Sequence, residues 1–588
     1  MTKREKTIKL LLLLIFFLPG GGLVCAFLLY FPMKGLIGSG RFDMHAIPAG
    51  EIMPEADDGH HIFEASTELS PVGALILERM STPPLNRDAT SEKMPSPKSI
   101  LARMAAGKDL EQVNALLCQL YPERGVGSSW WLRRGDYDFK LATWTTLLYL
   151  FGHNEERLYP ETRRHLLEVL LTESGGSPKT TVPGSVGLVV ETENHILLAE
   201  SSRYLKNQWL HLQGTEEERL NPRHDNKRNG LENWLLSFLD RIIDEGVYEF
   251  NSRPYSGYSF HALLNLEGFA EEKALRKKAR FILDRENYVY ALGSLQLRRF
   301  PPFRRQYRRA DTQHLSSDPH SAFFYVWTAV TADDERVLPW PGLYGDWSLM
   351  ASLLPYRLPD DLRHWALQKD APYYLRFSRG ANACPEVYSG GPGWLLSAGG
   401  ANRGVRSLLV ALPITLMLED GKTTLDECLH LQGKGTWRQW NHTGVYKNFA
   451  CSNGRAHIPE GWVAEAKASG WSIFRAALNK DLLIALYEEK DISLIVLFPE
   501  EAQSPDRLLE KLQQANADAR TLEHSFTRPD GTKIHYDLNA PRNRWVITGE
   551  NNQPLEQNWR HWEQITGTVP HISFHRPEAD DEEREHRY

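Results

Sequence analysis

The sequence is poor in cysteine and has no strong excess of charge of either sign. Its 588 residues include five cysteines, and 68 lysines and arginines stand against 75 aspartates and glutamates, a net charge of −7. So few cysteines exclude a small scaffold stapled by disulfides, and no CxxC pair or Cys/His spacing typical of zinc occurs. A slightly acidic chain also lacks the basic face expected of a nucleic-acid-binding protein. We therefore expect no nucleic-acid partner, no bound metal and no cofactor.

Long uncharged runs are absent except at the N-terminus. Residues 10–33 carry no charge and come after Lys3, Arg4, Lys6 and Lys9. About 20 apolar residues cross a membrane, and the basic residues before this run favour export of the chain after it. We expect residues 1–34 to be an uncleaved membrane anchor, with a cleaved signal peptide as the alternative. Both interpretations put the body of the protein outside the cytoplasm, in the periplasm, on the cell surface or secreted.

Cysteine pairing is open in an exported chain. Cys118, Cys384, Cys428 and Cys451 allow up to two disulfides with three connectivities. Isolated buried thiols are the alternative.

The chain has no repeat of fixed period, which disfavours an α-solenoid. Residues 35–98 are rich in proline and polar residues, so we expect a linker or irregular arm. Residues 99–375 contain nine or more amphipathic patterns, of which Leu231–Ile243 follows helical spacing most clearly. These patterns predict stacked helical hairpins such as an α/α toroid.

After about Arg376 the hydrophobic period changes from near 3.6 to near 2. Strands are expected at Gly393–Ala398, Ser472–Ala477, Leu482–Tyr487 and Ile492–Phe498, with a hairpin of Lys533–Leu538 and Trp545–Thr548. We interpret the Gly-rich segment Tyr388–Trp394 as a structural turn. Strands after helices indicate a second domain, here an antiparallel β-sandwich over 376–575, followed by a charged tail at 576–588. The predicted fold class is therefore multidomain, α then β.

Two short segments carry residues suited to chemistry. The first is Glu191-Thr192-Glu193-Asn194-His195, at the start of an amphipathic pattern. It is either an ordinary helix N-terminus capped by Thr192 or Asn194, or a site where Asn194 and His195 bind a carboxylate and His195 moves a proton.

The second segment is residues 248–258, between two predicted helices. It contains Glu249, Asn251, Arg253, Tyr255 and Tyr258. A loop so dense in polar and aromatic side chains is either a loop packed by its own aromatics or a functional loop on a rigid scaffold. The two segments lie one helical hairpin apart, which favours a shared site.

An exported helical region with an Asn-His pair, a later tyrosine loop and a following β-sandwich resembles the α/α-toroid polysaccharide lyases of the heparinase and alginate-lyase group. The resemblance implies that Asn194 and His195 neutralise the carboxylate of a uronate, and that Tyr258, or else Tyr255, carries the proton. It also implies a further catalytic histidine, for which His320 and His261 are the candidates. The product would be an unsaturated uronic acid, with no metal obligatory.

Six arginines gather within 12 residues: Arg298, Arg299, Arg304, Arg305, Arg308 and Arg309. Because arginine pairs with carboxylate or sulfate in bidentate fashion, this cluster favours an anionic polysaccharide or oligosaccharide as partner. A solvated loop, or ion pairs with neighbouring acids, is the alternative. The expected substrate-binding residues are Glu193, Glu249, Asn251, Arg253, Arg304, Arg305 and Arg308.

Two other functions compete with the lyase. A glycoside hydrolase on the same toroid needs two carboxyl groups about 5–10 Å apart, for which Glu193 and Glu249 are available. A non-catalytic glycan-binding or envelope protein would use the aromatic residues and the arginines for recognition alone.

Overall fold

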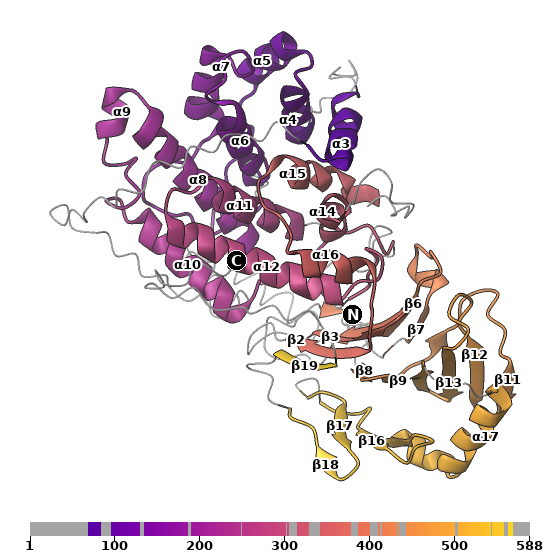
Figure 1. Cartoon of the computed structure of the whole chain (residues 1–588). Coiled ribbons are helices and arrows are strands. Elements are labelled where there is room, and N and C mark those ends of the chain that lie inside the picture. Colours follow the sequence, from indigo (N-terminus) through magenta and orange to yellow (C-terminus); the bar gives the residue numbers. More distant parts are fainter. Residues whose placement is uncertain are drawn as a thin grey trace, which may run out of the picture.

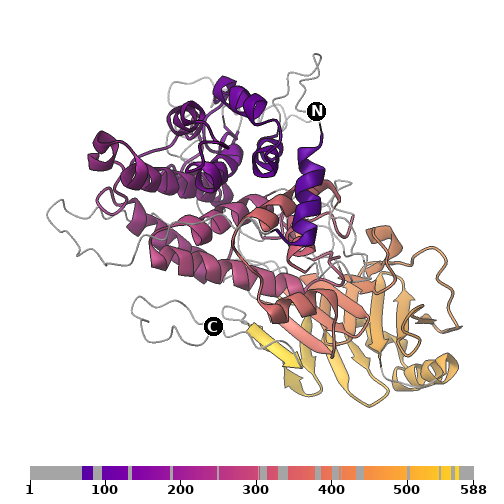
Figure 2. The same cartoon turned by 45° about the horizontal axis from the view of Figure 1, so that its top comes forward.

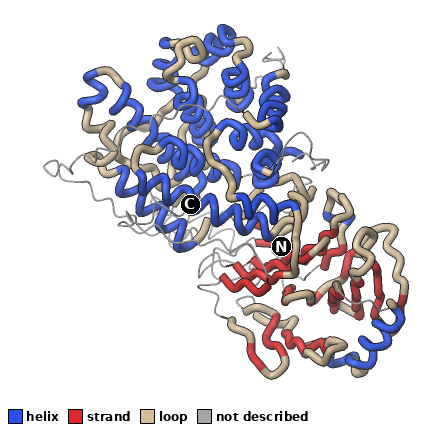
Figure 3. Tube along the Cα trace, viewed as in Figure 1, coloured by secondary structure: helices blue, strands red, loops and turns tan. Residues whose placement is uncertain are grey.

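The computed structural model describes residues 69–567 except 84–95, 130–134, 186–189, 248–249, 254, 302, 305–313, 329–341, 378–385, 400–409, 412–413, 432, 434–442, 500–503, 542–543 and 558–562. A helical region precedes a region of antiparallel sheets (Figures 1 and 3), so the predicted order is confirmed. The predicted anchor and charged tail lie outside the described residues. In the part of the chain that is described, no helix is long and apolar enough to cross a membrane.

The helical region runs from residue 71 to residue 367. Its helices are α3 (Pro71–Ser81), α4 (Pro97–Ala106), α5 (Leu110–Gln119), α6 (Asp138–Phe151), α7 (Pro160–His165), α8 (Glu193–Gln213), α9 (Glu216–Leu220), α10 (Leu231–Glu245), α11 (Ser256–Phe269), α12 (Lys273–Leu292), α14 (Pro319–Trp327), α15 (Ser348–Leu353) and α16 (Asp360–Leu367). A π-helical turn at Leu166–Leu170 extends α7, and a 3₁₀ turn at Gly342–Trp347 precedes α15.

Helix α3 lies inside the segment expected to be an irregular arm, so that expectation is wrong for Pro71–Ser81. The Ser70 hydroxyl accepts a hydrogen bond from the Gly73 amide at 3.0 Å, and Pro71 occupies the first turn. Both features favour a helix start. The helix packs against α4 and α15.

The helices contact one another in a closed ring. Helix α3 packs on α4, α4 on α6, α6 on α11, α11 on α14, α14 on α15, and α15 again on α3. Helix α8 packs on both α6 and α11, and α12 lies outside α11 (Figures 1 and 2). Residues 193–210 of α8 are buried along their whole length, including the polar ones. Such a helix needs internal hydrogen-bond partners for its polar side chains.

Two large sheets form most of the second region. The seven-stranded sheet has the order β10-β7-β6-β4-β3-β2-β19 and the six-stranded sheet the order β11-β12-β13-β14-β9-β8. The first contains β10 (Ala456–His457), β7 (Leu429–Leu431), β6 (Ile414–Leu418), β4 (Trp394–Gly399), β3 (Glu386–Gly391), β2 (Tyr373–Phe377) and β19 (Glu563–Gly567). The second contains β11 (Ala466–Ala468), β12 (Trp471–Arg475), β13 (Leu483–Glu489), β14 (Ile492–Phe498), β9 (Phe449–Asn453) and β8 (Thr443–Tyr446).

Smaller elements complete this region. A four-stranded sheet is formed by β15 (Ser525–Thr527), β16 (Lys533–Tyr536), β17 (Ile547–Glu550) and β18 (Gln553–Pro554), and α17 spans Pro505–Ala515. The short strands β1 (Phe303–Arg304) and β5 (Val410–Ala411) pair with each other. The strands predicted at Ser472–Ala477 and Leu482–Tyr487 are confirmed and pair as β12–β13, and the predicted hairpin corresponds to β16–β17. Tyr388–Trp394 is part of the β3–β4 hairpin.

Strands β2, β3, β4 and β6 of the seven-stranded sheet are buried on both faces. Alternate residues of β2 show this: Tyr373, Leu375 and Phe377 belong to the hydrophobic core of the helices, whereas Tyr374 belongs to the core shared with the six-stranded sheet. Alternation of side chains along a strand explains the division. The molecule is therefore layered as helices, seven-stranded sheet and six-stranded sheet (Figure 2). Cys118, Cys428 and Cys451 are free thiols, which favours isolated thiols for these three, and Cys384 lies outside the described residues.

Candidate active site

A buried histidine–aspartate pair joins the starts of two helices. His195 lies in the first turn of α8, and its Nδ1 is 2.6 Å from Oδ2 of Asp138, the first residue of α6. Burial alone would lower the pKa of His195. The hydrogen bond and charge of Asp138, with the charges of Glu191 and Asp136, outweigh burial and raise that pKa above its usual value. The pair therefore favours the protonated form of the imidazole.

Hydrogen bonds hold the neighbours of His195 to the loop of Ser128 and to Thr192. Glu191 accepts hydrogen bonds from the backbone amide and the hydroxyl of Ser128, at 2.7 and 3.0 Å. Asn194 is 1% exposed, and its side-chain oxygen accepts a hydrogen bond from the Thr192 hydroxyl. Glu193, one of the expected binding residues, is also buried. Thr192 is the N-cap residue of α8, although its side chain makes no capping bond.

Three predicted site residues meet around one phenylalanine. The ring of Phe139 lies 4.9 Å from that of His195, 4.4 Å from that of Tyr258 and 6.3 Å from that of Tyr255. Tyr258 stacks on Phe139 and meets Trp347 edge-on at 4.9 Å. Burial and the nearby carboxylates of Asp346 and Asp138 raise the pKa of Tyr258. The structure therefore brings His195 and the loop tyrosines together, and Asn194 directly precedes His195 in the first turn of α8.

A lysine lies over Trp347, the tryptophan that Tyr258 contacts. Lys98 of α4 is an ion-pair partner of Asp346 at 2.8 Å and lies over the ring of Trp347. Burial lowers the pKa of Lys98, and the charge of Asp346 offsets part of this effect. His261, the alternative catalytic histidine, is buried nearby with its Nε2 2.8 Å from the Thr146 hydroxyl. Burial and Lys98 lower the pKa of His261 to about 3, so it is neutral at physiological pH.

His320 belongs to a different polar cluster, which lies between the helices and the seven-stranded sheet. Arg299 makes a bidentate ion pair with Asp318 and also donates to Nδ1 of His320 at 3.3 Å. Asn251 donates to Glu386 of β3 at 2.9 Å, and Arg253 donates to the backbone of His314 at 2.8 Å. These side chains are almost fully buried. Asn251 links the helices to β3, and Arg253 and His320 belong to this second cluster and not to the site around Phe139.

The arginine cluster divides in two. Arg298 donates to the backbone oxygens of Lys422 and Leu418, and Arg299 pairs with Asp318, so both are structural. This matches the alternative of ion pairs with neighbouring acids. The side chain of Arg304 and the whole of Glu249, Arg305 and Arg308 lie outside the described residues.

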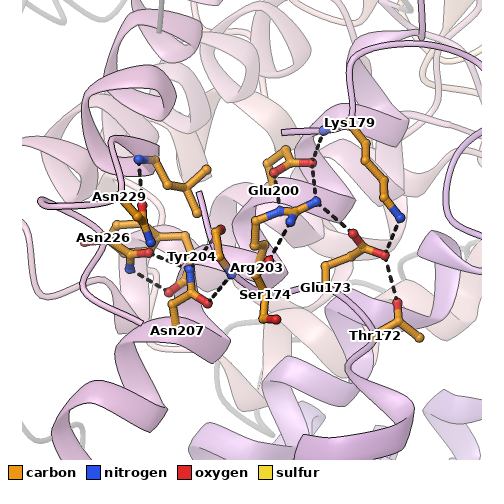
Figure 4. A network of polar contacts seen from close by, with 12 residues as sticks. Thr172, Glu173, Ser174, Lys179, Glu200, Arg203, Tyr204, Asn207, Asn226 and Asn229 are labelled. Carbon is orange, nitrogen blue, oxygen red and sulfur yellow. Dashed lines mark hydrogen bonds and ion pairs between the residues drawn. The ribbon is translucent and has the colours of Figure 1, made fainter. Parts of the chain in front are cut away.

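A network of buried polar side chains fixes the loop that leads into the site (Figure 4). Arg203 of α8 donates to Glu200 and Glu173, each at 2.7 Å, and to the backbone of Ser174. Lys179 donates its backbone amide to Glu200 and its ammonium group to Glu173, both at 2.8 Å. The chain then returns to α8 through a bridge between Thr181 and Val190. The network therefore holds the segment that carries Glu191.

A cavity of about 490 Å³ lies elsewhere, where the helices meet the turns of both large sheets. Its lining residues are Gln296, Leu367, Gln368, Lys369, Pro392, Gly393, Leu418, Glu419, Asp420, Ala476, Ala477, Leu478 and Asn479. None of the predicted site residues belongs to this set. Among the described residues, no group of three or more histidine, cysteine, aspartate or glutamate side chains is arranged to hold a metal ion.

Sequence reasoning missed Asp138, Phe139 and Lys98. The pair Asp138-Phe139 stands at the start of α6, and a carboxylate there is a signal for a helix N-terminus. Its partner His195 is 57 residues away, so no local pattern reveals the contact. No family model, curated protein or solved structure matches this chain.

Proposed function

We propose that this protein is a polysaccharide lyase-like enzyme that cleaves an anionic, uronate-containing glycan by β-elimination. The observation that carries the proposal is the meeting of His195, Tyr255 and Tyr258 around Phe139, with His195 paired to Asp138. The ring of helix contacts supports an α/α toroid, and the two large facing sheets support a β-sandwich. The uncharged N-terminal run supports an anchored body outside the cytoplasm.

The reaction requires a cation near the uronate carboxylate. The imidazolium of His195 and the amide of Asn194 would donate hydrogen bonds to this carboxylate and lower the pKa of the adjacent C5 proton. Loss of that proton forms the C4–C5 double bond as the bond from C4 to the leaving O4 breaks. Tyr258, whose pKa is raised, keeps its proton at neutral pH and suits protonation of O4. Tyr255, whose ring lies 6.3 Å from that of Phe139, is the candidate that removes the C5 proton, acting as tyrosinate, while Tyr258 becomes tyrosinate as O4 takes its proton.

The test is an assay of the purified protein on a panel of uronate polymers and one neutral glycan. Elimination yields an unsaturated product that absorbs in the ultraviolet, and Tyr258→Phe and His195→Ala should each abolish that absorbance. A hydrolase would yield reducing ends with no ultraviolet product. Binding without either product would support the non-catalytic glycan-binding function and contradict the lyase.

A further inference from the structure

We propose that Asp138 is a positioning residue that fixes the orientation and protonation of His195, so that His195 presents an Nε2–H bond to the substrate carboxylate. This inference rests on the proposed function for the identity of the ligand. The contact between Asp138 and His195 is tested independently of any substrate.

Both oxygens of Asp138 have fixed partners. Oδ2 lies 2.6 Å from Nδ1 of His195, and Oδ1 accepts a hydrogen bond from the backbone amide of Gly127 at 2.9 Å. The side chain of Asp138 is fully buried, and among the described residues it has no lysine or arginine partner. Its charge is compensated by this amide, by the N-terminus of α6 and by His195. The proton between Nδ1 of His195 and Oδ2 of Asp138 belongs on Nδ1, because the carboxylate then accepts a charge-assisted hydrogen bond.

The amide that holds Asp138 depends on an unusual backbone conformation. Gly127 has φ +97°, and a Cβ atom there would lie 2.9 Å from Pro183 and 3.0 Å from a carboxylate oxygen of Glu191. Only glycine tolerates both the conformation and the close approach. The loop carrying Gly127 is thus pressed against the loop carrying Glu191, and Asp138 is fixed between them and α8.

The other charges that face His195 are also acidic. Glu191 precedes α8 and Asp136 precedes α6, and the charge of each raises the pKa of His195. Tyr258 of α11 and Tyr255, the N-cap residue of that helix, approach His195 through the ring of Phe139. Among the described residues, Nε2 of His195 has no hydrogen-bond partner, while 6% of the side chain remains exposed. Because Asp138 binds Nδ1, the Nε2–H group of the imidazolium is left to donate to a ligand, and this donor suits an anion.

The experiment compares Asp138→Asn with Asp136→Asn in the full chain. Histidine is labelled with ¹⁵N, and the His195 signal is assigned with His195→Gln and followed against pH. In the unaltered protein, His195 should titrate above its usual pKa and carry its proton on Nδ1 when neutral. Asp138→Asn should lower that pKa by about one unit or more and shift the pH profile of uronate cleavage toward acid, with a larger effect on kcat than on KM. Asp136→Asn should have a smaller effect on both.

Two results would overturn the inference. One is a His195 titration that Asp138→Asn leaves unchanged. The other, which needs no variant and so applies even if Asp138→Asn fails to fold, is a neutral His195 carrying its proton on Nε2 in the unaltered protein. If no uronate polymer is cleaved, the proposed function fails, but the titration still decides the role of Asp138.

Discussion

Two buried histidines, His195 at the start of α8 and His261 within α11, have pKa values shifted in opposite directions. Asp138 raises the pKa of His195, whereas burial and Lys98 lower that of His261 to about 3. A raised pKa in the folded state adds stability that is complete below the unfolded value near 6.5 and is lost as pH rises through the folded pKa. A lowered histidine pKa has the reverse effect, because the unfolded chain binds the proton more tightly below pH 6.5.

We predict that His195→Gln and His261→Gln change the free energy of unfolding with opposite pH dependence. The loss caused by His195→Gln should be larger at about pH 5.5 than at about pH 8.5, by about 1.4 kcal/mol for each unit of raised pKa. The loss caused by His261→Gln should be smaller at about pH 5.5. Denaturant unfolding of both variants beside the unaltered protein measures this. Parallel pH dependence of the two variants would contradict the assigned directions.

Asn194 allows a second test at the residue scale. Its amide is buried beside His195, so Asn194→Ala removes a donor whose value increases as negative charge develops on the uronate. We expect kcat to fall about 100-fold or more, with KM changed much less. Steady-state kinetics on the best uronate polymer would measure both. A variant that loses affinity but keeps its turnover would exclude the neutralising role.

At the scale of elements, α8 is anchored by side chains one turn apart. Glu200, Arg203 and Asn207 lie on one face and bind the loop after residue 172. Arg203 and Glu200 are almost completely buried, so each charge depends on its ion-pair partner for compensation. Removing one partner of such a group leaves the others without compensation.

Arg203→Met should therefore destabilise the helical region by about 3–5 kcal/mol. The amides of Gly175 and Lys179, which bind side chains of α8, should exchange hydrogen faster. Hydrogen exchange of peptides covering residues 172–191 provides the measurement. The control is Arg363→Met, since Arg363 makes an exposed pair with Asp360 on α16 and should contribute less than about 1 kcal/mol. Equal effects of the two variants would refute an anchoring role.

Regular elements were predictable because their signals are local. The helix pattern at Leu231–Ile243 corresponds to α10 (Leu231–Glu245), and the strand at Ile492–Phe498 is confirmed residue for residue. Helix α3 was missed because the prolines and polar residues around it resemble a linker. Its stability comes from packing on α4 and α15, and a local pattern does not contain such packing.

The site was predictable only in part for the same reason. Asn194, His195 and Tyr258 stand out by residue type, and the structure brings His195 and Tyr258 together at Phe139. Arg299 also stands out, yet it is 1% exposed and paired with Asp318, 19 residues away. Whether an arginine faces solvent or a buried carboxylate depends on tertiary contacts. Sequence alone therefore overestimates the arginines available to a substrate.

At the scale of the whole molecule, the helices and the seven-stranded sheet share one hydrophobic core. The sheet residues Tyr388 and Leu395 belong to the same cluster as the helical core. Arg298 and Glu386 add polar links across this boundary, to Leu418 of β6 and Asn251 respectively. The boundary near residue 375 thus separates two patterns of secondary structure but not two independent cores, and we expect the two regions to unfold together.

Gly293, at the C-terminal end of α12, allows this boundary to be tested. A Cβ atom there would lie 2.6 Å from the Tyr388 ring, although φ of −94° suits any residue. Gly293→Ala should therefore cost about 1–3 kcal/mol through overpacking and lower the unfolding temperature of helices and sheets alike. In a Tyr388→Leu background the added methyl no longer meets the ring, although its 2.8 Å approach to the backbone oxygen of Val289 remains, so the cost of Gly293→Ala should fall but not vanish. Calorimetry of the four proteins of this cycle measures the coupling. Additive effects, or a separate transition for the sheets that Gly293→Ala leaves unmoved, would contradict a shared core.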